Sequence, residues 1–156
     1  MSGSSVERVR SALAEAGLAD AVVEFPAGTR TAEDAARAVG CTVAQIAKSI
    51  VLRAGERAVV VIASGTNRVD PAKVAALAGQ PVKRADADFV RAATGFAIGG
   101  VAPVGHLSPP LLVLDRDLLA LDPIWAAAGS PSHVFPTTAA ALARMTGAVV
   151  AEVRQA

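Results

Sequence analysis

The sequence predicts an α/β (α+β) fold, in which one domain has a central mixed β-sheet flanked by helices. Helical segments with capping residues alternate along the chain with short apolar segments, as in domains that pack helices on a sheet. Residues 58–63 are apolar on both faces of the predicted strand, which is typical of a central strand covered on each side. The chain has 156 residues without an internal repeat or a linker, so we expect a single domain over residues 1–156.

Capping and breaking residues define the elements of the N-terminal half. A first helix runs from a cap at Ser4 or Ser5 to about Ala16, with Val6, Val9 and Leu13 on one stripe and Gly17 as its stop. Next come a strand over residues 21–25 closed by Pro26-Ala-Gly28, and a helix over residues 32–39 that begins at Thr31 and ends at Gly40. A capping box of Thr42 with Gln45 precedes the strand around Lys48, and the central strand over residues 58–63 follows.

The C-terminal half continues the alternation. Asp70 and Pro71 are a strong start for a helix to Ala78 that Gly79 stops, and Asp86 or Asp88 opens a short helix to about Ala93. A glycine-rich segment, residues 94–105, comes next. The remaining predicted elements are strands over residues 111–114, 124–128 and 132–135, a helix from Thr137 or Thr138 to Thr146, and a closing strand over residues 148–153.

Composition narrows the class of protein. No stretch approaches eighteen apolar residues without polar breaks, and the N-terminus lacks the pattern of a secretory signal, so we expect no membrane span and a cytoplasmic location. The single cysteine, Cys41, excludes an intrachain disulfide framework. A net charge of +1 and five scattered aromatic residues provide neither a broad basic surface nor a stacking platform. Any contact with nucleic acid is therefore expected to be local.

Lys48 lies in a segment, residues 46–53, that otherwise has the pattern of a buried strand. Alternation places it on one face with Ile46, Ile50 and Leu52, so an ammonium shares an apolar surface. Such a lysine reaches water along its stem, binds an anion, or has a lowered pKa suited to chemistry. From the pattern alone, a functional lysine and a snorkelling lysine at a sheet margin both stay open. We expect the ammonium to face the glycine-rich segment.

The glycine-rich segment is the second candidate. Its glycines at positions 95, 99, 100 and 105 allow sharp turns and leave N–H groups free to bind an oxyanion or a phosphate. A tight loop between strands would have the same composition. The segment is neither a Walker loop, because no Gly-Lys-Ser/Thr ends it, nor a dinucleotide fingerprint, because no long helix follows.

The third candidate is Gly129-Ser-Pro-Ser-His133, a turn with two hydroxyls and an imidazole. A serine hydrolase built on Ser130 or Ser132 with His133 is conceivable, although no Gly-x-Ser-x-Gly elbow is present. A serine so close in sequence to its histidine is expected to be poorly placed to pair with it. A metal site from Cys41, His106 and His133 lacks paired ligand spacing, and the sequence predicts no metal ligands.

Four segments resemble, in order and spacing, the YbaK/EbsC family, which is related to the editing domain of bacterial prolyl-tRNA synthetase. They are residues 42–51, which include Lys48, residues 58–65, residues 97–105 and residues 129–133. The resemblance covers about residues 20–155, nearly the whole chain. It implies a compact mixed sheet with flanking helices, in agreement with the fold predicted above.

The resemblance implies a trans-editing aminoacyl-tRNA deacylase, a hydrolase that serves translation fidelity. Such proteins hydrolyse the ester between a wrongly attached amino acid and the terminal adenosine of a tRNA, with neither a metal nor a cofactor. Catalytic roles are implied for Lys48, Gly99 and Gly100. The implied substrate-binding residues are Ser49, Ser64, Gly65, Val101, Ala102, Pro103, Gly129, Ser130 and His133. Ser49 stands where alanine-editing relatives have Asn.

The expected substrate is a mischarged tRNA that carries a small amino acid, with tRNA-Pro bearing Cys or Ala as the leading candidate. The expected partners are the acceptor end of the aminoacyl-tRNA and, as a further candidate, a synthetase such as prolyl-tRNA synthetase. The chain is expected to be a monomer or a homodimer. Two alternatives stay open: a non-catalytic module that binds an aminoacyl-tRNA end or a nucleotide, and a plain hydrolase of small esters.

Overall fold

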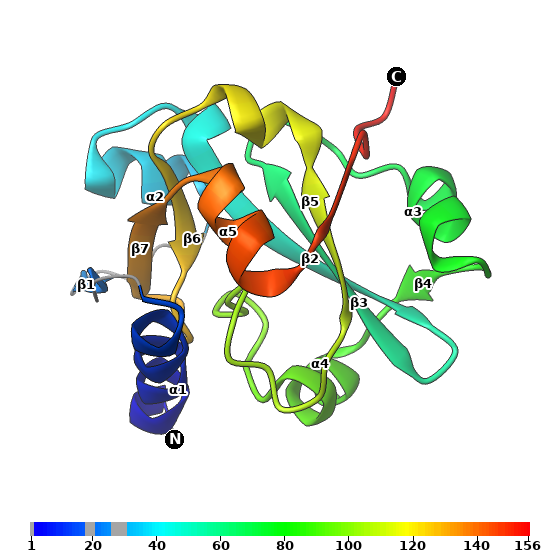
Figure 1. Cartoon of the computed structure of the whole chain (residues 1–156), viewed down its shortest axis with the longest axis horizontal. Helices are drawn as coiled ribbons and strands as arrows, with labels where there is room; N and C mark the ends of the chain where they lie inside the picture. Colours follow the sequence, from blue (N-terminus) through cyan, green and yellow to red (C-terminus); the bar gives the residue numbers. More distant parts are fainter. Residues whose placement is uncertain (1, 18–20, 26–30) are drawn as a thin grey trace.

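Eight strands form one mixed sheet in the computed structural model, which describes residues 2–17, 21–25 and 31–156 (Figure 1). The strand order is β1-β7-β6-β2-β3-β5-β8, and β4 pairs with β2 beside this path. The strands are β1 (Val23–Glu24), β2 (Ile46–Ala54), β3 (Arg57–Ser64), β4 (Lys83–Arg84), β5 (Leu111–Asp115), β6 (Ile124–Ala127), β7 (His133–Thr137) and β8 (Val149–Ala151).

Helices cover both faces of this sheet. They are α1 (Ser2–Glu15), α2 (Ala32–Val39), α3 (Pro71–Ala78), α4 (Ala87–Thr94) and α5 (Ala139–Thr146), with 3-10 turns η1 (Val43–Gln45) and η2 (Arg116–Ala120). Side-chain caps begin four of the helices, at Thr31, Asp70, Asp86 and Thr138. Among the described residues, no helix has the length and apolar character needed to cross a bilayer.

The central strands separate two apolar layers. Along β3, Val60 and Ile62 pack in one cluster with α1, α5 and the glycine-rich segment. The alternate residues Val59, Val61 and Ala63 pack in the other cluster with Val74 of α3. Both layers are shielded from solvent, because Ala58 to Ser64 are all buried. The expected central strand covered on each face is therefore confirmed.

Strand pairing leaves a gap in the sheet beside β2. This strand runs antiparallel to β3 along its whole length, with Lys48 opposite Ala63. Its pairing with β6 on the other side is parallel and restricted to Ile46 with Trp125 and Ala47 with Ala126. Beyond these pairs, β4 joins this edge of β2 only at Leu52 and Arg53, so the unpaired stretch of the edge is residues 48–51, beside the cavity described below.

Most element boundaries agree with the sequence prediction, and the differences are at the ends of elements. The first helix begins at Ser2 rather than after a cap at Ser4 or Ser5, although Val6, Val9 and Leu13 are buried as expected. The predicted strand over residues 21–25 is only Val23–Glu24, and the predicted closing turn at residues 26–28 lies outside the described residues. The strand β4 and the turn η2 were not predicted, because neither has a recurring apolar pattern.

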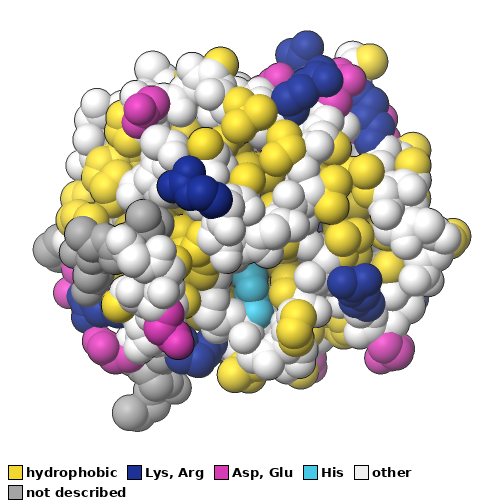
Figure 2. All heavy atoms as spheres, in the orientation of Figure 1, with side chains coloured by type: hydrophobic (Ala, Val, Ile, Leu, Met, Phe, Trp, Pro, Cys, Tyr) yellow, Lys and Arg dark blue, Asp and Glu magenta, His cyan; other side chains and the backbone are white. Residues whose placement is uncertain are grey.

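Charged side chains are dispersed on the face of the molecule that Figure 2 shows, and hydrophobic side chains lie between them. Where basic residues gather, acidic residues are mixed with them. Glu152 lies 3.6 Å from Lys73 and 3.7 Å from Arg116, and Arg154 lies 3.7 Å from Asp117. These exposed pairs contribute little to stability, and they mix both signs of charge at this end of the sheet.

Candidate active site

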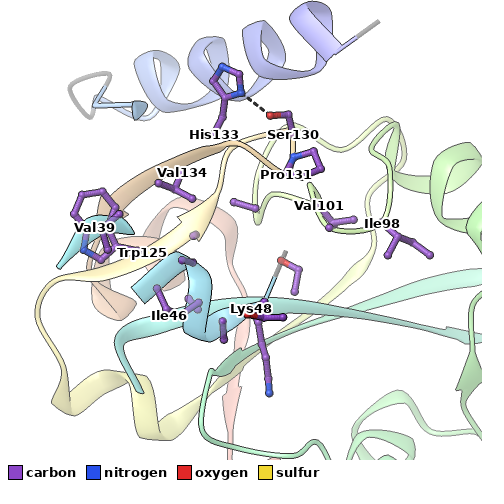
Figure 3. A pocket seen from close by; sticks show the side chains of 18 residues that line it. Val39, Ile46, Lys48, Ile98, Val101, Trp125, Ser130, Pro131, His133 and Val134 are labelled. Carbon is purple, nitrogen blue, oxygen red and sulfur yellow. Dashed lines mark hydrogen bonds between the residues drawn. The ribbon is translucent and has the colours of Figure 1, made fainter. Parts of the chain in front are cut away.

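A cavity of about 290 Å³ lies beside β2 and β6, where their pairing ends (Figure 3). Three further segments complete its wall: the helix α2, the glycine loop (residues 95–105) and the serine turn (residues 129–133). The lining is predominantly apolar. It consists of Thr31, Ala32, Ala35, Val39, Ile46, Ala47, Lys48, Ser49, Ile98, Gly99, Val101, Trp125, Ala126, Ala127, Ser130, Pro131, His133 and Val134.

Lys48 lines this cavity, but its ammonium does not face the glycine loop as expected. Strand alternation places Lys48 on the face of Ile46 and Ile50, whereas Ala47 packs in the cluster that contains Val101. The side chain points away from Val101 in Figure 3, and its Nζ donates to the carbonyl oxygen of Gly65 at 3.3 Å. Desolvation by burial lowers the pKa of Lys48, with the Glu33 carboxylate acting in the opposite direction.

Ser49 takes the position toward the glycine loop that was expected for Lys48. It lies on the same face of β2 as Ala47 and Val51, both of which pack in the cluster of Val101. Its Oγ is buried and has no hydrogen-bond partner among the described residues, although the residue lines the cavity. A buried hydroxyl without a partner is costly unless a ligand or water satisfies it, which makes Ser49 a candidate to bind substrate.

Three residues of the glycine loop line the cavity, and the backbone N–H groups of all three, Ile98, Gly99 and Val101, have no partner among the described residues. Gly99 has a φ of 93°, a conformation that favours glycine, and its N–H has no partner within the described part of the chain. The Gly100 N–H was also expected to be a donor to the substrate, but it donates to the carbonyl oxygen of Ala97 at 3.0 Å. Gly100 instead allows close packing, since a Cβ there would lie 2.7 Å from the Ser130 Cα.

The serine turn pairs Ser130 with His133, contrary to the expectation that they would be poorly placed. Their Oγ and Nδ1 atoms lie 2.5 Å apart, as the dashed line in Figure 3 marks. The Ser130 Oγ also accepts the Ser132 N–H at 3.2 Å and lies 3.3 Å from the Ser132 Oγ. The other ring nitrogen, Nε2, lies 3.7 Å from a Glu24 carboxylate oxygen. The nucleophilic role that the sequence left conceivable therefore has a Ser–His hydrogen bond, but no Gly-x-Ser-x-Gly elbow.

Several predicted site residues lie near the cavity without lining it. Ser64 donates its hydroxyl to the Ala44 carbonyl oxygen at 2.7 Å, and Gly65 presents its carbonyl to Lys48. Ala102 is buried behind the loop, and Pro103 lines a separate surface hollow beside α1. Gly129 packs against α1, where a Cβ would lie 2.7 Å from the Ser5 carbonyl oxygen. None of these five residues is among the residues that line the cavity.

The sequence interpretation missed the wall that α2 provides. Ala32, Ala35 and Val39 recur on one face of the helix, pack with Ile46 and Trp125, and line the cavity. Their spacing of three and four residues is the ordinary signal of a helix that packs on a core, so it did not mark them as site residues. Trp125 was likewise placed in a strand without a role.

Within the described ranges, the structure places no three His, Cys, Asp or Glu side chains together as a metal site. Cys41 packs in the cluster of α2, where burial raises the pKa of its thiol. His106 lies at the far end of the glycine loop, in edge-to-face contact with Phe96 at 5.7 Å between ring centroids. Neither residue lines the cavity that contains His133.

Comparison with known proteins agrees with this geometry. A family model described as an aminoacyl-tRNA editing domain matches residues 26–145. A crystal structure of a candidate trans-editing enzyme for prolyl-tRNA synthetase is 46% identical, with a TM-score of 0.91, over 97% of this chain and 98% of that one. The structure of the hypothetical protein APE2540 is 30% identical, with a TM-score of 0.88, over 95% and 99% of the two chains. The uncharacterised protein YwhH of Bacillus subtilis (strain 168) is 29% identical over 135 residues, which are 86% of each chain.

Proposed function

The chain belongs to the aminoacyl-tRNA editing domain family, and from that premise we propose that it hydrolyses the ester of a mischarged aminoacyl-tRNA carrying a small amino acid. The observation that carries this proposal is the apolar cavity beside β2. Its wall contains the Gly99 N–H and the Ser49 hydroxyl, neither of which has a partner among the described residues. An apolar cavity with a few fixed polar groups is the usual form of a small-ligand site.

The reaction needs a stabilised carbonyl oxygen more than it needs a protein nucleophile. Water attacks the ester carbonyl carbon, the bond to the ribose oxygen breaks, and that oxygen leaves with a proton as the free hydroxyl of the terminal adenosine. The Gly99 N–H, with Ser49 as a second donor, binds the oxygen on which negative charge develops. The neighbouring ribose hydroxyl or a bound water assists proton transfer, because the substrate is held in position.

Lys48 binds the nucleotide end of the substrate in this proposal. Its Nζ lies on the α2 side of β2, away from Ser49. The one hydrogen bond that it makes among the described residues, to Gly65 at 3.3 Å, is long enough to be exchanged for a better acceptor. A phosphate or ribose oxygen that enters beside α2 would be that acceptor. The acyl group would then lie across the open edge of β2, with its carbonyl toward the glycine loop.

The size of the cavity favours a small acyl group. From α2, Ala32 and Ala35 contribute only methyl groups, while Val101 and Trp125 limit the space from the loop and from β6. A synthetase rejects a smaller or isosteric amino acid by only about 10–200-fold, so a second site that accepts just the small errors is useful. The likeness to a candidate trans-editing enzyme for prolyl-tRNA synthetase supports tRNA-Pro as the tRNA, and the small lining side chains are the reason to propose Cys or Ala as the amino acid.

The remaining predicted residues act around this centre. Val101, Ser130 and His133 contact the substrate from the cavity wall, while Ser64, Gly65, Ala102, Pro103 and Gly129 hold that wall in place. We also propose that the reaction requires no metal. Deacylation should then continue at an unchanged rate after dialysis against EDTA, and a loss of rate that zinc restores would contradict this part.

The direct test is a panel of charged tRNAs incubated with the purified chain. Release of Ala or Cys from tRNA-Pro, with correctly charged Pro-tRNA-Pro left intact, is the expected result. Saturable binding of these tRNAs without release of amino acid would instead indicate a non-catalytic module. Equal cleavage of free aminoacyl esters and charged tRNAs would indicate a plain esterase.

A further inference from the structure

The helix α1 lies outside the residues 26–145 that match the family model, yet it contacts both loops of the cavity wall. It packs against the serine turn, where a Cβ added to Gly129 would lie only 2.7 Å from the Ser5 carbonyl oxygen. It also packs against the glycine loop, where Gly105 lies against the backbone of Arg8. The same helix therefore contacts two parts of the wall that are distant in sequence, and Figure 3 shows it as the blue helix beside Ser130 and His133.

Arg8 bridges the two ends of the glycine loop. Its Nη2 donates to the Gly95 carbonyl oxygen at 2.8 Å, and its Nε donates to the Gly105 carbonyl oxygen at 3.1 Å. The guanidinium lies 4.8 Å from the centre of the Phe96 ring, which is buried beneath it. One planar group thus makes two charge-assisted hydrogen bonds and a cation–π contact with a single loop.

These contacts fix the part of the backbone that carries Gly99 and Val101. The base of the loop is closed independently, because Leu107 and Ser108 donate to the Thr94 and Ala93 carbonyl oxygens. The Arg8 bonds are added across the loop's two ends, at Gly95 and Gly105. Without the Arg8 bridge the loop would still be closed at its base, but the backbone between Gly95 and Gly105 would have fewer fixed contacts.

We propose that Arg8 is a positioning residue for the editing reaction, which sets the place of the Gly99 N–H by joining Gly95 to Gly105. This inference rests on the function proposed above. Only arginine has the planar fork needed to reach both carbonyl oxygens, because lysine presents one point charge. A small displacement of a fixed donor lowers the rate of the chemical step more than it weakens substrate binding.

The test compares Arg8→Ala and Arg8→Lys with a matched control, Arg10→Ala. Arg10 lies on the same helix and pairs with Glu7 at 2.8 Å on the surface. Both Arg8 variants are expected to lower kcat about 10–100-fold with KM for charged tRNA changed less than about twofold. Arg10→Ala is expected to match the wild type. Millimolar guanidinium should restore part of the kcat of Arg8→Ala, because the ion fits the space left by the side chain.

Hydrogen exchange separates this role from general stability and from the proposed function itself. In Arg8→Ala, amides of residues 95–105 are expected to exchange faster, while amides of β3 keep the wild-type rate. Unchanged loop exchange would overturn the proposal, as would a fall in kcat accompanied by equally faster exchange in β3. If the wild type cleaves no mischarged tRNA, the editing function fails, but the exchange measurement still decides whether Arg8 orders the loop.

Discussion

At the scale of single residues, the proposed site depends on two neighbouring polar residues of β2 that point to opposite faces of the sheet. Lys48 and Ser49 are neighbours in sequence, and strand geometry directs them to opposite sides of the sheet. The sequence identified Lys48 as a site residue from its charge in an apolar strand. It could not show which face is open to the cavity, because that depends on where β6 ends and where α2 packs.

Replacing Lys48 by methionine should abolish most of the activity without unfolding the protein. The variant keeps an unbranched apolar stem on the same face but cannot bind a phosphate or ribose oxygen. We expect kcat/KM of this variant for the mischarged tRNA to fall at least about 100-fold. In His133→Ala we expect kcat/KM to fall only about fivefold, which corresponds to the loss of one hydrogen bond worth about 1 kcal/mol. Deacylation rates of the three proteins measure both effects. Equal losses in the two variants would make His133 a proton-transfer group.

The lowered pKa of Lys48 predicts how stability changes with pH. Between the lowered pKa of the folded state and the ordinary value of 10.5, the unfolded chain holds the proton that the folded chain has released. Stability therefore rises with pH in this window, because the unfolded state binds more protons. We expect the wild type to gain stability relative to Lys48→Met as the pH is raised from neutral toward 10.5. Urea unfolding of both proteins across that range is the measurement, and a constant difference would contradict the prediction.

At the scale of elements, local signals in the sequence predicted the helices well. Thr31, Asp70, Asp86 and Thr138 each cap a helix, and a left-handed glycine ends each of the same four helices. The glycine loop and the serine turn were predicted as segments, but their contact with each other was not. Close packing of Gly100 on Ser130 joins residues far apart in sequence, and neither local pattern contains that information.

Gly100→Ala tests that contact between the loop and the turn. A methyl group would lie 2.7 Å from Ser130 Cα, so the two backbones must separate, at a cost of about 1–3 kcal/mol in unfolding free energy. Activity should fall with it, because Gly99 and Ser130 both line the cavity. Gly147→Ala, just after α5, is the control, because a Cβ there would meet no other atom within 4 Å. Its φ of 68° alone should lower the unfolding free energy by about 1–2 kcal/mol when alanine replaces glycine. Similar losses of stability with activity lost only in Gly100→Ala are the expected result.

The helix α2 is expected to limit the size of the acyl group. Ala35→Leu fills part of the cavity, so kcat/KM for Cys-tRNA-Pro should fall about 10-fold more than for Ala-tRNA-Pro. Ala36 is buried on the same helix but does not line the cavity, which makes Ala36→Leu the matched control for overpacking. Parallel assays with both tRNAs give the ratio. An unchanged ratio in Ala35→Leu would place the acyl group elsewhere.

At the scale of the whole molecule, the structure combines a defined cavity with a surface that has little net charge. The chain carries a net charge of +1, and the charged residues at the end of the sheet are of mixed sign. Such a surface provides few phosphate contacts for the body of a tRNA. Recognition is therefore expected to depend on the acceptor end in the cavity, with a synthetase as a candidate to hold the rest of the tRNA.

The central claim is that the cavity beside β2 hydrolyses the ester of a wrongly attached small amino acid. The most direct measurement is the single-turnover rate at which the wild-type chain releases the amino acid from Cys-, Ala- and Pro-tRNA-Pro. The account predicts that Cys or Ala is released at least about 100-fold faster than Pro. Release of all three at one rate, or at the rate seen in buffer alone, would contradict it.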